Sequence, residues 1–438
     1  MNNHGDSEKI IGLLEKSAPQ TPAGLERRII DAGIERLLVE KKGHGFRLFY
    51  YAAAAVLLLA MTIVFVSKGR FVVQEQAKRK CGECWRFVGF DAGNSRRSSS
   101  DFCVPTALVW QTAVQNPNGA YKPLGWKGLI IVGTGTSREG SLIAINAENG
   151  ETRWKRDFTS GDFYKSRRFP DRCIINQRFY ITDGSQCLVM DPLSGKTLKT
   201  LLPPEPALGW SYLSAEGNRL YGGTHDGRQI FCVDAGNGKP LWTHGLQAPA
   251  FIPALSQGKL FVHTSEGEVM ALNTTDGSTA WRLENTGVAG RSSIHVRDGL
   301  LAILTQNDDL ALFSSKNGKA LWKAHEEGLS NASLALGDDA VYVKGGNEAL
   351  SLDNGKTLWN NAGNPISSCS PPTLLKSKLI SMSNFGLRDL NIMDLSGRTV
   401  GSLKVMDRHV CDGAIVLNGK VFTVGAEKIA AFGCAKGG

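Results

Sequence analysis

The nine residues DAGNGKPLW at positions 234–242 are one copy of a pattern that recurs along the chain. Related stretches are NAENGETRW at 146–154, NTTDGSTAW at 273–281 and SSKNGKALW at 314–322. Each has a polar first residue, a glycine, and a tryptophan four residues after the glycine. The glycine recurs seven times, 37 to 45 residues apart, as Gly150, Gly195, Gly238, Gly277, Gly318, Gly355 and Gly397.

A second marker repeats in step with these turns. Eight short β-rich runs each follow a polar turn: GLIIVG, RFYITD, RLYGGT, KLFVHT, GLLAIL, AVYVKG, KLISMS and KVFTVG. Short alternating strands and glycine-containing turns at a period near 40 residues are the signature of propeller blades. The 50 glycines of the chain agree with many tight turns. We therefore predict an all-β fold, an eight-bladed β-propeller, over residues 103–438.

The two ends of this repeat region complement each other. The last run, at 420–434, ends without a turn glycine or an outer strand, whereas VPTALVWQTAV at 104–114 is a strand without a blade. We predict that the early strand becomes the outer strand of the eighth blade, which leaves no open edge in the ring. Antiparallel pairing would bring Cys103 beside Cys434, and we predict a disulfide between them.

The repeated turn has a structural role that needs no ligand. Asp or Asn at its first position can accept hydrogen bonds from the backbone amides ahead of it, as in an Asx-turn. Glycine supplies the positive φ that closes the bend. The tryptophan can lie in the groove between neighbouring blades and bury about 200 Å² of ring surface there. We predict this blade-locking role for the seven turn glycines and for Trp154, Trp242, Trp281, Trp322 and Trp359.

The turns resemble the Asp-x-x-x-Gly-x-x-x-Trp repeats of the PQQ-like (quinoprotein-type) β-propeller superfamily. The resemblance extends from about Val104 to the C-terminus and departs from the pattern where Lys199 and Gly401 replace the tryptophan. This superfamily contains quinone-dependent dehydrogenases. It also contains non-catalytic propellers, such as the lipoprotein subunit of the outer-membrane β-barrel assembly machinery.

The features that the resemblance implies for quinone chemistry are not evident in the sequence. The alcohol dehydrogenases hold the quinone against a disulfide of adjacent cysteines, beside a calcium ion bound by acidic and amide side chains. This chain has no Cys-Cys pair, no insertion large enough for a lid, and no obvious set of Glu, Asn and Asp repeated across blades. A hard cation needs several oxygen ligands. We predict no catalytic, cofactor-binding or metal-binding residue, so the non-catalytic members are the nearer ones.

An uncharged apolar run of 19 residues begins at Leu48 and ends at Val66. As a helix it spans about 28 Å, close to the hydrocarbon thickness of a bilayer. No small-x-small cleavage site follows, so we predict a transmembrane helix at 48–66. Lys and Arg are balanced on its two sides, but all nine cysteines follow it, which favours an oxidising compartment beyond it. We predict a single-pass protein of the bacterial inner membrane with the propeller on the periplasmic side.

Residues 1–47 are predicted to form a cytoplasmic helical tail. Thr21 and Pro22 provide a helix start, and leucine and isoleucine then recur at helical spacing. This apolar stripe has to be buried against a neighbouring segment, a second copy of the chain or a cytoplasmic partner.

Residues 67–102 are predicted to be a juxtamembrane stub and linker, because GNSRRSSSD at 93–101 has a linker composition. Cys81 and Cys84 of CGEC could be a redox pair, half of a zinc site or a small disulfide loop. No second CxxC exists for zinc, and a disulfide loop or an idle pair is favoured. His225 and His263, near predicted hairpin turns, are expected to face solvent.

Lys and Arg are scattered along the chain, and without a basic face we expect no nucleic-acid binding. We predict a membrane-anchored extracytoplasmic propeller that serves as a protein-binding platform or envelope assembly scaffold, with partners on the loops at one end of the ring. Two alternatives stay open. One is a membrane-bound PQQ-dependent dehydrogenase, and the other is a transmembrane sensor whose tail docks a cytoplasmic partner.

Overall fold

The computed structural model divides the chain into two compact units, residues 1–80 and 81–438. The structure describes parts of the second unit: residues 84–87, 89–98, 102–114, 120–135, 139–159, 172–288, 294–329, 334–361, 371–382, 389–405, 413–425 and 427–434. Within these ranges no helix is long and apolar enough to cross a membrane. The tail at 1–47, the apolar run at 48–66 and Cys81 lie outside them, so their interpretations stay predictions.

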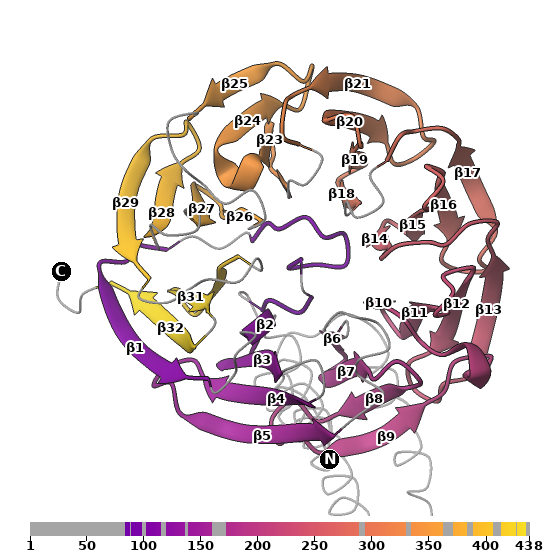
Figure 1. Cartoon of the computed structure of the whole chain (residues 1–438), viewed down its shortest axis with the longest axis horizontal. Helices are drawn as coiled ribbons and strands as arrows, with labels where there is room; N and C mark the ends of the chain where they lie inside the picture. Colours follow the sequence, from indigo (N-terminus) through magenta and orange to yellow (C-terminus); the bar gives the residue numbers. More distant parts are fainter. Residues whose placement is uncertain are drawn as a thin grey trace, which may run out of the picture. The chain divides into compact units, whose positions relative to one another are not determined.

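The described residues of the second unit form eight four-stranded antiparallel sheets arranged as the blades of a ring (Figure 1). The predicted all-β fold with eight blades is confirmed. In blades one to seven the four strands follow one another in sequence, from the innermost to the outermost strand (Figure 1). The eighth blade combines three strands from the end of the chain with one from near residue 110.

The strand bounds show how regular the repeat is. Blades one to four comprise β2 (Ala120–Trp126), β3 (Leu129–Gly135), β4 (Glu139–Asn146), β5 (Thr152–Thr159); β6 (Arg172–Ile175), β7 (Arg178–Thr182), β8 (Cys187–Met190), β9 (Thr197–Leu201); β10 (Leu213–Glu216), β11 (Arg219–Gly223), β12 (Gln229–Asp234), β13 (Pro240–Gly245); and β14 (Ala254–Ser256), β15 (Lys259–His263), β16 (Val269–Asn273), β17 (Thr279–Leu283). Blades five to eight comprise β18 (His295–Arg297), β19 (Leu300–Leu304), β20 (Asp309–Ser314), β21 (Ala320–His325); β22 (Ala335–Leu336), β23 (Ala340–Val343), β24 (Glu348–Ser351), β25 (Thr357–Asn360); β26 (Thr373–Leu374), β27 (Lys378–Met382), β28 (Asp389–Asp394), β29 (Thr399–Lys404); and β30 (Ile415–Leu417), β31 (Lys420–Val424), β32 (Lys428–Gly433) with β1 (Ala107–Ala113). Two short 3-10 helices, Pro206–Leu208 and Lys344–Gly346, interrupt this pattern.

The middle strands of the blades are buried on both faces. In β7, β11 and β15 every residue after the first is buried, as expected for short apolar runs packed between neighbouring sheets. The outermost strands are largely exposed, and in β13 only the tryptophan is buried. The hydrophobic core therefore consists of layers between adjacent blades instead of one central cluster.

The ring has two unlike faces. On one face, the turn between the first and second strands of a blade contacts the turn between its third and fourth strands. Ala147 N donates to Gly128 O at 2.8 Å in blade one, and Ala235 N donates to Asn218 O at 2.9 Å in blade three. We call this the turn face. The opposite, loop face has the hairpins between second and third strands and the connections from one blade to the next.

Strand β1 closes the ring as the outer strand of blade eight. It pairs antiparallel with β32, from Ala107 opposite Gly433 to Ala113 opposite Lys428, as the sequence predicts. Cys103 and Cys434 form a disulfide with their Cα atoms 6.3 Å apart. The other seven blades join their third and fourth strands by a turn, so this disulfide supplies the covalent link where the eighth turn would be.

The same junction explains why blade seven lacks a tryptophan. Gly401 pairs with Ile392 at the position where blade six pairs Trp359 with Ala349. The side chain of Val104 lies against Gly401, and a Cβ added at Gly401 would overlap Val104 Cγ1. Because blade eight has no turn glycine for an indole to cover, the entering chain fills that space instead.

The substitution Gly401→Ala is therefore expected to lower the free energy of unfolding by about 1 to 3 kcal/mol, the usual cost of overpacking a filled site. Val104→Ala in the same protein is expected to recover part of this loss, because a smaller side chain makes room. Thermal unfolding midpoints measure both effects. Gly245→Ala is the control, since no atom lies within 4 Å of a Cβ added there. Equal midpoints for Gly401→Ala and Gly245→Ala would contradict this explanation of the junction.

The predicted linker at 67–102 is wrong for residues 84–98. The described residues of this stretch belong to the propeller unit and cross the middle of the ring (Figure 1), where Ser95, Arg96 and Ser98 are buried. We call residues 84–98 the channel segment. Phe102 then packs against blades seven and eight, before the chain reaches the outer wall at β1. The propeller unit thus begins well before residue 103.

Candidate functional site

Six of the seven repeated turns are closed in the same way, and the turn of blade seven is one residue shorter. The amide of each turn glycine donates to the carbonyl of the first turn residue at 2.8 to 3.1 Å. Each of these glycines has a φ between 68° and 85°. Asn146 Oδ1 and Asp191 Oδ1 also accept backbone amides two residues ahead, at 2.9 and 3.0 Å. These are the hydrogen bonds of an Asx-turn.

Each tryptophan of this set covers the turn glycine of the next blade. The indole Nε1–H of Trp242 donates to Thr274 O at 3.1 Å, and a Cβ added at Gly277 would lie 2.6 Å from the indole Cε3. The glycine is therefore needed both for its positive φ and for the indole packed on its Cα. The same hydrogen bond, at 2.7 to 3.1 Å, joins Trp154 to Pro192 O, Trp281 to Ser315 O, Trp322 to Leu352 O and Trp359 to Leu395 O.

A sixth tryptophan has the same role and is not among the five predicted from sequence. Trp110, in β1, donates to Ala147 O at 3.1 Å and covers Gly150. Its position within VPTALVWQTAV, the strand predicted to close the ring, is the signal that could have found it. Blade two has Lys199 in place of the indole, and the Lys199 ammonium donates to Gly236 O in the next turn.

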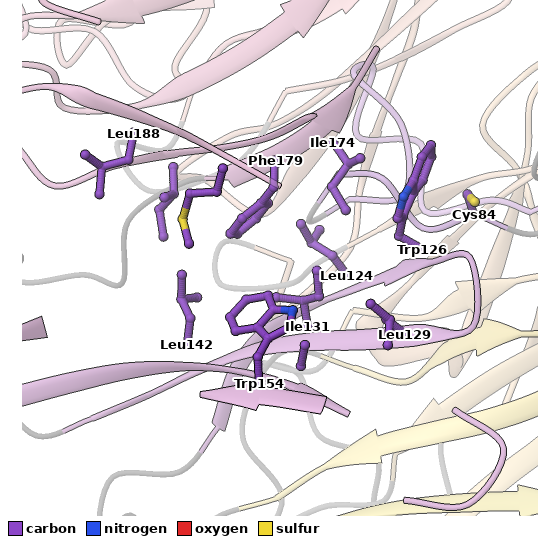
Figure 2. Packing of buried hydrophobic residues seen from close by; sticks show 13 residues of the cluster. Cys84, Leu124, Trp126, Leu129, Ile131, Leu142, Trp154, Ile174, Phe179 and Leu188 are labelled. Carbon is purple, nitrogen blue, oxygen red and sulfur yellow. The ribbon is translucent and has the colours of Figure 1, made fainter. Parts of the chain in front are cut away.

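The tryptophans also belong to the core between blades. Figure 2 shows Trp154 beside Ile131 and Leu142 of blade one, in the same cluster as Phe179 of blade two. An indole in this position fills the space between two neighbouring sheets and donates its N–H to a turn carbonyl. The packing and hydrogen bonding of the repeated motif are therefore accounted for by the architecture of the ring.

The channel segment places backbone carbonyls against the innermost strands of six blades. One amide from each of these blades donates to it, at 2.7 to 3.1 Å. All six amides have the same register, opposite the second residue of the second strand of their blade. The donors and acceptors are Gly125 to Trp85, Ile174 to Arg86, Leu255 to Ala92, Val296 to Gly93, Leu336 to Ser95 and Leu374 to Arg96.

Aromatic packing holds the first part of the channel segment. Trp85 is fully buried and meets Phe90 edge to face, with ring centroids 5.0 Å apart. The guanidinium of Arg96 lies 5.4 Å from the centroid of the same indole. Trp85 also joins the hydrophobic cluster between blades one and eight. The segment is thus folded back on itself around this indole.

Charged groups hold its second part. Asp91 accepts hydrogen bonds from Ser95 N at 2.9 Å and from Ser95 Oγ at 2.5 Å, and burial raises the pKa of Asp91. Arg97 forms a two-pronged ion pair with Asp338, and Arg297 Nη2 approaches the same carboxylate at 2.8 Å. The hydrogen bonds from Arg97 and Arg297 lower the pKa of Asp338 to about 2.

The described cysteines are either disulfide-bonded or buried. Cys84 forms a disulfide whose partner lies outside the described residues, as does Cys81. Cys173, Cys187 and Cys232 are buried thiols. Burial raises the pKa of the Cys187 thiol and raises that of Cys232 to about 12. The thiols of Cys187 and Cys232 are therefore protonated at neutral pH and chemically inert.

Blades four to seven share a carboxylate at the start of the third strand, which sequence reasoning missed: Glu268, Asp309, Glu348 and Asp389. Three of the four pair with a cation of their own blade, as Arg282 with Glu268, Lys323 with Asp309 and Lys344 with Glu348. Within the described ranges no three His, Cys, Asp or Glu side chains gather to hold a metal ion. Glu268, Asp309 and Glu348 therefore each have a cationic partner in their own blade.

On the loop face of blade three, the inter-blade connections at 202–212 and 246–253 flank the hairpin at 224–229. His225 N donates to Leu208 O of one connection at 2.9 Å, and Ala250 N of the other donates to Gly227 O at 2.8 Å. We call these three stretches the blade-three platform. Backbone hydrogen bonds brace it as one surface.

The platform exposes two large apolar side chains, Leu202 (55%) and Ile252 (41%). The other exposed large apolar residues of the described ranges lie in outermost strands or in turns. The expectation that His263 faces solvent is wrong, because the connection at 246–253 covers it. His263 is buried and stacks on Phe251 with the ring centroids 4.9 Å apart.

Comparison with known proteins agrees with this geometry. The family model described as outer membrane protein assembly factor BamB matches residues 185–384. BamB of Yersinia pestis is 22% identical over 274 residues, which cover 57% of this chain and 60% of that protein. BamB of Salmonella typhimurium is 27% identical over 192 residues, covering 39% and 48%. The chain belongs to the PQQ-like β-propeller superfamily.

Solved PQQ-like propellers share the fold of this chain. BamB from Moraxella catarrhalis superposes with a TM-score of 0.55 at 16% identity, covering 75% of this chain and 99% of that one. A quinohemoprotein alcohol dehydrogenase from Pseudomonas putida HK5 superposes with a TM-score of 0.62 at 9% identity, covering 82% and 81%. Likeness at these identities shows the fold alone, since PQQ-like propellers host unrelated functions.

The sequence matches to curated PQQ-like propellers are partial. The aligned part of this chain spans 48% to 60% of the length of the two BamB proteins named above. The matched region includes blades three to six, where the turn motif with its tryptophan is most regular. Blades two and seven of this PQQ-like propeller depart from the motif, at Lys199 and Gly401.

Proposed function

We propose that this PQQ-like propeller is a protein-binding scaffold whose partner docks on the blade-three platform. The observation that carries the proposal is the exposure of Leu202 and Ile252 on loops braced by backbone hydrogen bonds. Loops held by a rigid scaffold are the usual carriers of function. An apolar side chain on such a loop is well placed to anchor an apolar patch on a partner protein. Similarity to BamB, an outer membrane protein assembly factor by name, supports a role of this class.

The loop face is a better candidate than the other surfaces of the ring. The turn face carries the repeated motif, whose tryptophans and glycines are used in holding blades together. The end of the channel on that face is already occupied by the channel segment. The outer wall exposes leucines such as Leu241 and Leu358, but these are the residues before a locking tryptophan, and they recur with the motif. Leu202 and Ile252 lie instead on connections between blades, outside the repeated motif.

We further propose that the propeller lies outside the cytoplasm, on the periplasmic side of a bacterial inner membrane, with residues 48–66 as its anchor. The Cys103–Cys434 disulfide and the disulfide of Cys84 support an oxidising compartment, because disulfides are rare in the cytoplasm. The tail at 1–47 would then face the cytoplasm, where its apolar stripe could dock a partner.

The substitution Ile252→Glu is expected to reduce capture of the partner about tenfold or more. A carboxylate placed in an apolar contact has to be desolvated, and truncation or disruption of a central anchor commonly costs more than 1.4 kcal/mol. Tagged full-length protein is used to capture partners from solubilised membranes of its own cells, with quantitative mass spectrometry as the readout. Leu202→Glu should have the same direction of effect.

Leu358→Glu is the matched control, because it places the same charge on a 55% exposed leucine of the outer wall. This variant is expected to capture the same proteins as the unsubstituted chain. Equal capture by Ile252→Glu and Leu358→Glu would show that the platform does not receive the partner.

A further inference from the structure

The channel segment points to a second binding site, at the turn-face end of the channel. Its residues 91–98, which we call the polar arm, lie along blades four to seven. The amides of Leu255, Val296, Leu336 and Leu374 donate to carbonyls of this arm at 2.7 to 3.1 Å. The site therefore recognises backbone carbonyls, as the edge of a sheet recognises an added strand.

The innermost strands explain why such a site exists. Each is the inner edge of its blade, so its backbone groups on the channel side have no partner strand within the blade. The amides that bind the arm come from equivalent positions in four consecutive blades. His295 adds a side-chain contact, with Nδ1 2.7 Å from Asn94 O. Burial lowers the pKa of His295 to about 4, so the neutral ring donates this hydrogen bond.

Two side chains of the arm, Arg97 and Arg96, add contacts with the blades to those of the backbone. Arg97 forms a two-pronged ion pair with Asp338, in which the Arg97 side chain is 15% exposed and the Asp338 side chain 60% exposed. Arg96 is buried, and its guanidinium approaches Pro372 O and Thr373 Oγ1 of blade seven at 3.5 Å. The arm is thus held by backbone contacts and by arginine, with no apolar side chain comparable to Trp85.

One position of the arm is sterically selective. A Cβ added at Gly93 would overlap Val296 O and lie 3.3 Å from Leu255 O. Both are backbone atoms of strands inside the ring, so neither can move aside without disturbing its blade. The site accepts glycine there and excludes every other residue.

We propose that the turn-face end of the channel is a receptor for an extended polypeptide, and that the polar arm is its built-in, exchangeable occupant. The matching ligand has a glycine at the place of Gly93 and an arginine four residues later. The arm is tied to the ring by Trp85 before it and by the Cys103–Cys434 disulfide after it. Tethering of this kind gives an effective concentration of about millimolar, which keeps the site filled although its contacts are modest. The site lies on the face opposite to the blade-three platform, so either site can exist without the other.

A fluorescent peptide of residues 89–98 and the full-length protein test this proposal. Gly93→Ala in the protein is expected to weaken the hold of the arm, so that the peptide binds saturably in fluorescence anisotropy. The unsubstituted protein should bind at least about tenfold more weakly, because its own arm fills the site. A peptide with alanine at the Gly93 position should bind neither protein, since it carries the same overlap. Gly245→Ala, at an uncrowded glycine, should behave as the unsubstituted protein does.

Hydrogen exchange of the Asp338→Asn variant is a second test, which can be used even if Gly93→Ala prevents the protein from folding. This variant removes an exposed charge that pairs with the arm. The amides of Leu255, Val296 and Leu336 are expected to exchange about tenfold faster, which corresponds to about 1.4 kcal/mol, while strands β15 and β19 keep their rates. Two results would overturn the proposal. One is failure of the peptide to bind folded Gly93→Ala protein, and the other is exchange of the three amides only together with β15 and β19.

Discussion

Replacement of Trp242 by alanine is expected to lower the free energy of unfolding by about 3 to 5 kcal/mol, as is usual for a buried tryptophan. The indole is buried between blades three and four, and its Nε1–H donates to Thr274 O. Its loss removes the hydrogen bond and leaves a cavity at the seam. Chemical denaturation monitored by far-UV circular dichroism measures the change.

The neighbouring residue provides the control. Leu241→Ala removes a side chain that is 44% exposed, and its expected effect is below about 1 kcal/mol. Gly277→Ala should cost less in the Trp242→Ala background than in the unsubstituted protein, because the added Cβ then no longer meets the indole at 2.6 Å. Its remaining cost comes from the φ of +74°. Additive effects of the two substitutions would contradict the packing of this indole on this glycine.

Loss of the Cys103–Cys434 disulfide is expected to destabilise the protein by about 3 to 5 kcal/mol. The bond closes a loop with a sequence separation of 331 residues, and the entropic stabilisation by a disulfide grows with the logarithm of loop length. The double variant Cys103→Ser/Cys434→Ser is compared with the unsubstituted protein by thermal unfolding without reductant. Blade eight should be the first to open, because no turn connects β1 to β32.

Hydrogen exchange locates the change. The amides of β1 and β32 are expected to lose protection in the double variant, while those of blade four keep it. Cys232→Ala serves as the control, since Cys232 is a buried free thiol far from the junction in sequence. Unchanged protection of β1 would show that strand pairing alone holds the ring closed.

The eight blades and their closure could be predicted from sequence because their determinants are local. A turn such as 234–242 contains its own Asx-type first residue, its glycine and its tryptophan, and it recurs at a regular spacing. Closure followed from the same regularity, since one blade lacked an outer strand and one strand lacked a blade. The departure at Gly401, by contrast, is explained by a contact with Val104, which is far from it in sequence.

The channel segment could not be predicted in the same way, because its partners are far apart in sequence. The amides that bind it run from Gly125 to Leu374, and no pattern in the segment itself encodes them. Residues 91–94 read DAGN, as do residues 234–237 of the repeated turn. This identity indicates a turn at Asp91, whereas the serines and arginines after it indicate a linker. Burial of His263 was missed for a related reason, since the residues that cover it belong to a connection between blades.

Photo-crosslinking in intact cells tests the proposed scaffold role most directly. A benzophenone amino acid is placed at Ile252 of the platform or at Leu358 of the outer wall, two leucine-sized exposed positions of the same protein. A partner that docks on the platform predicts a discrete adduct of higher mass from position 252 and none from position 358. An adduct from position 358 alone, or none from position 252 in cells where the protein is functional, would contradict the role proposed for the loop face.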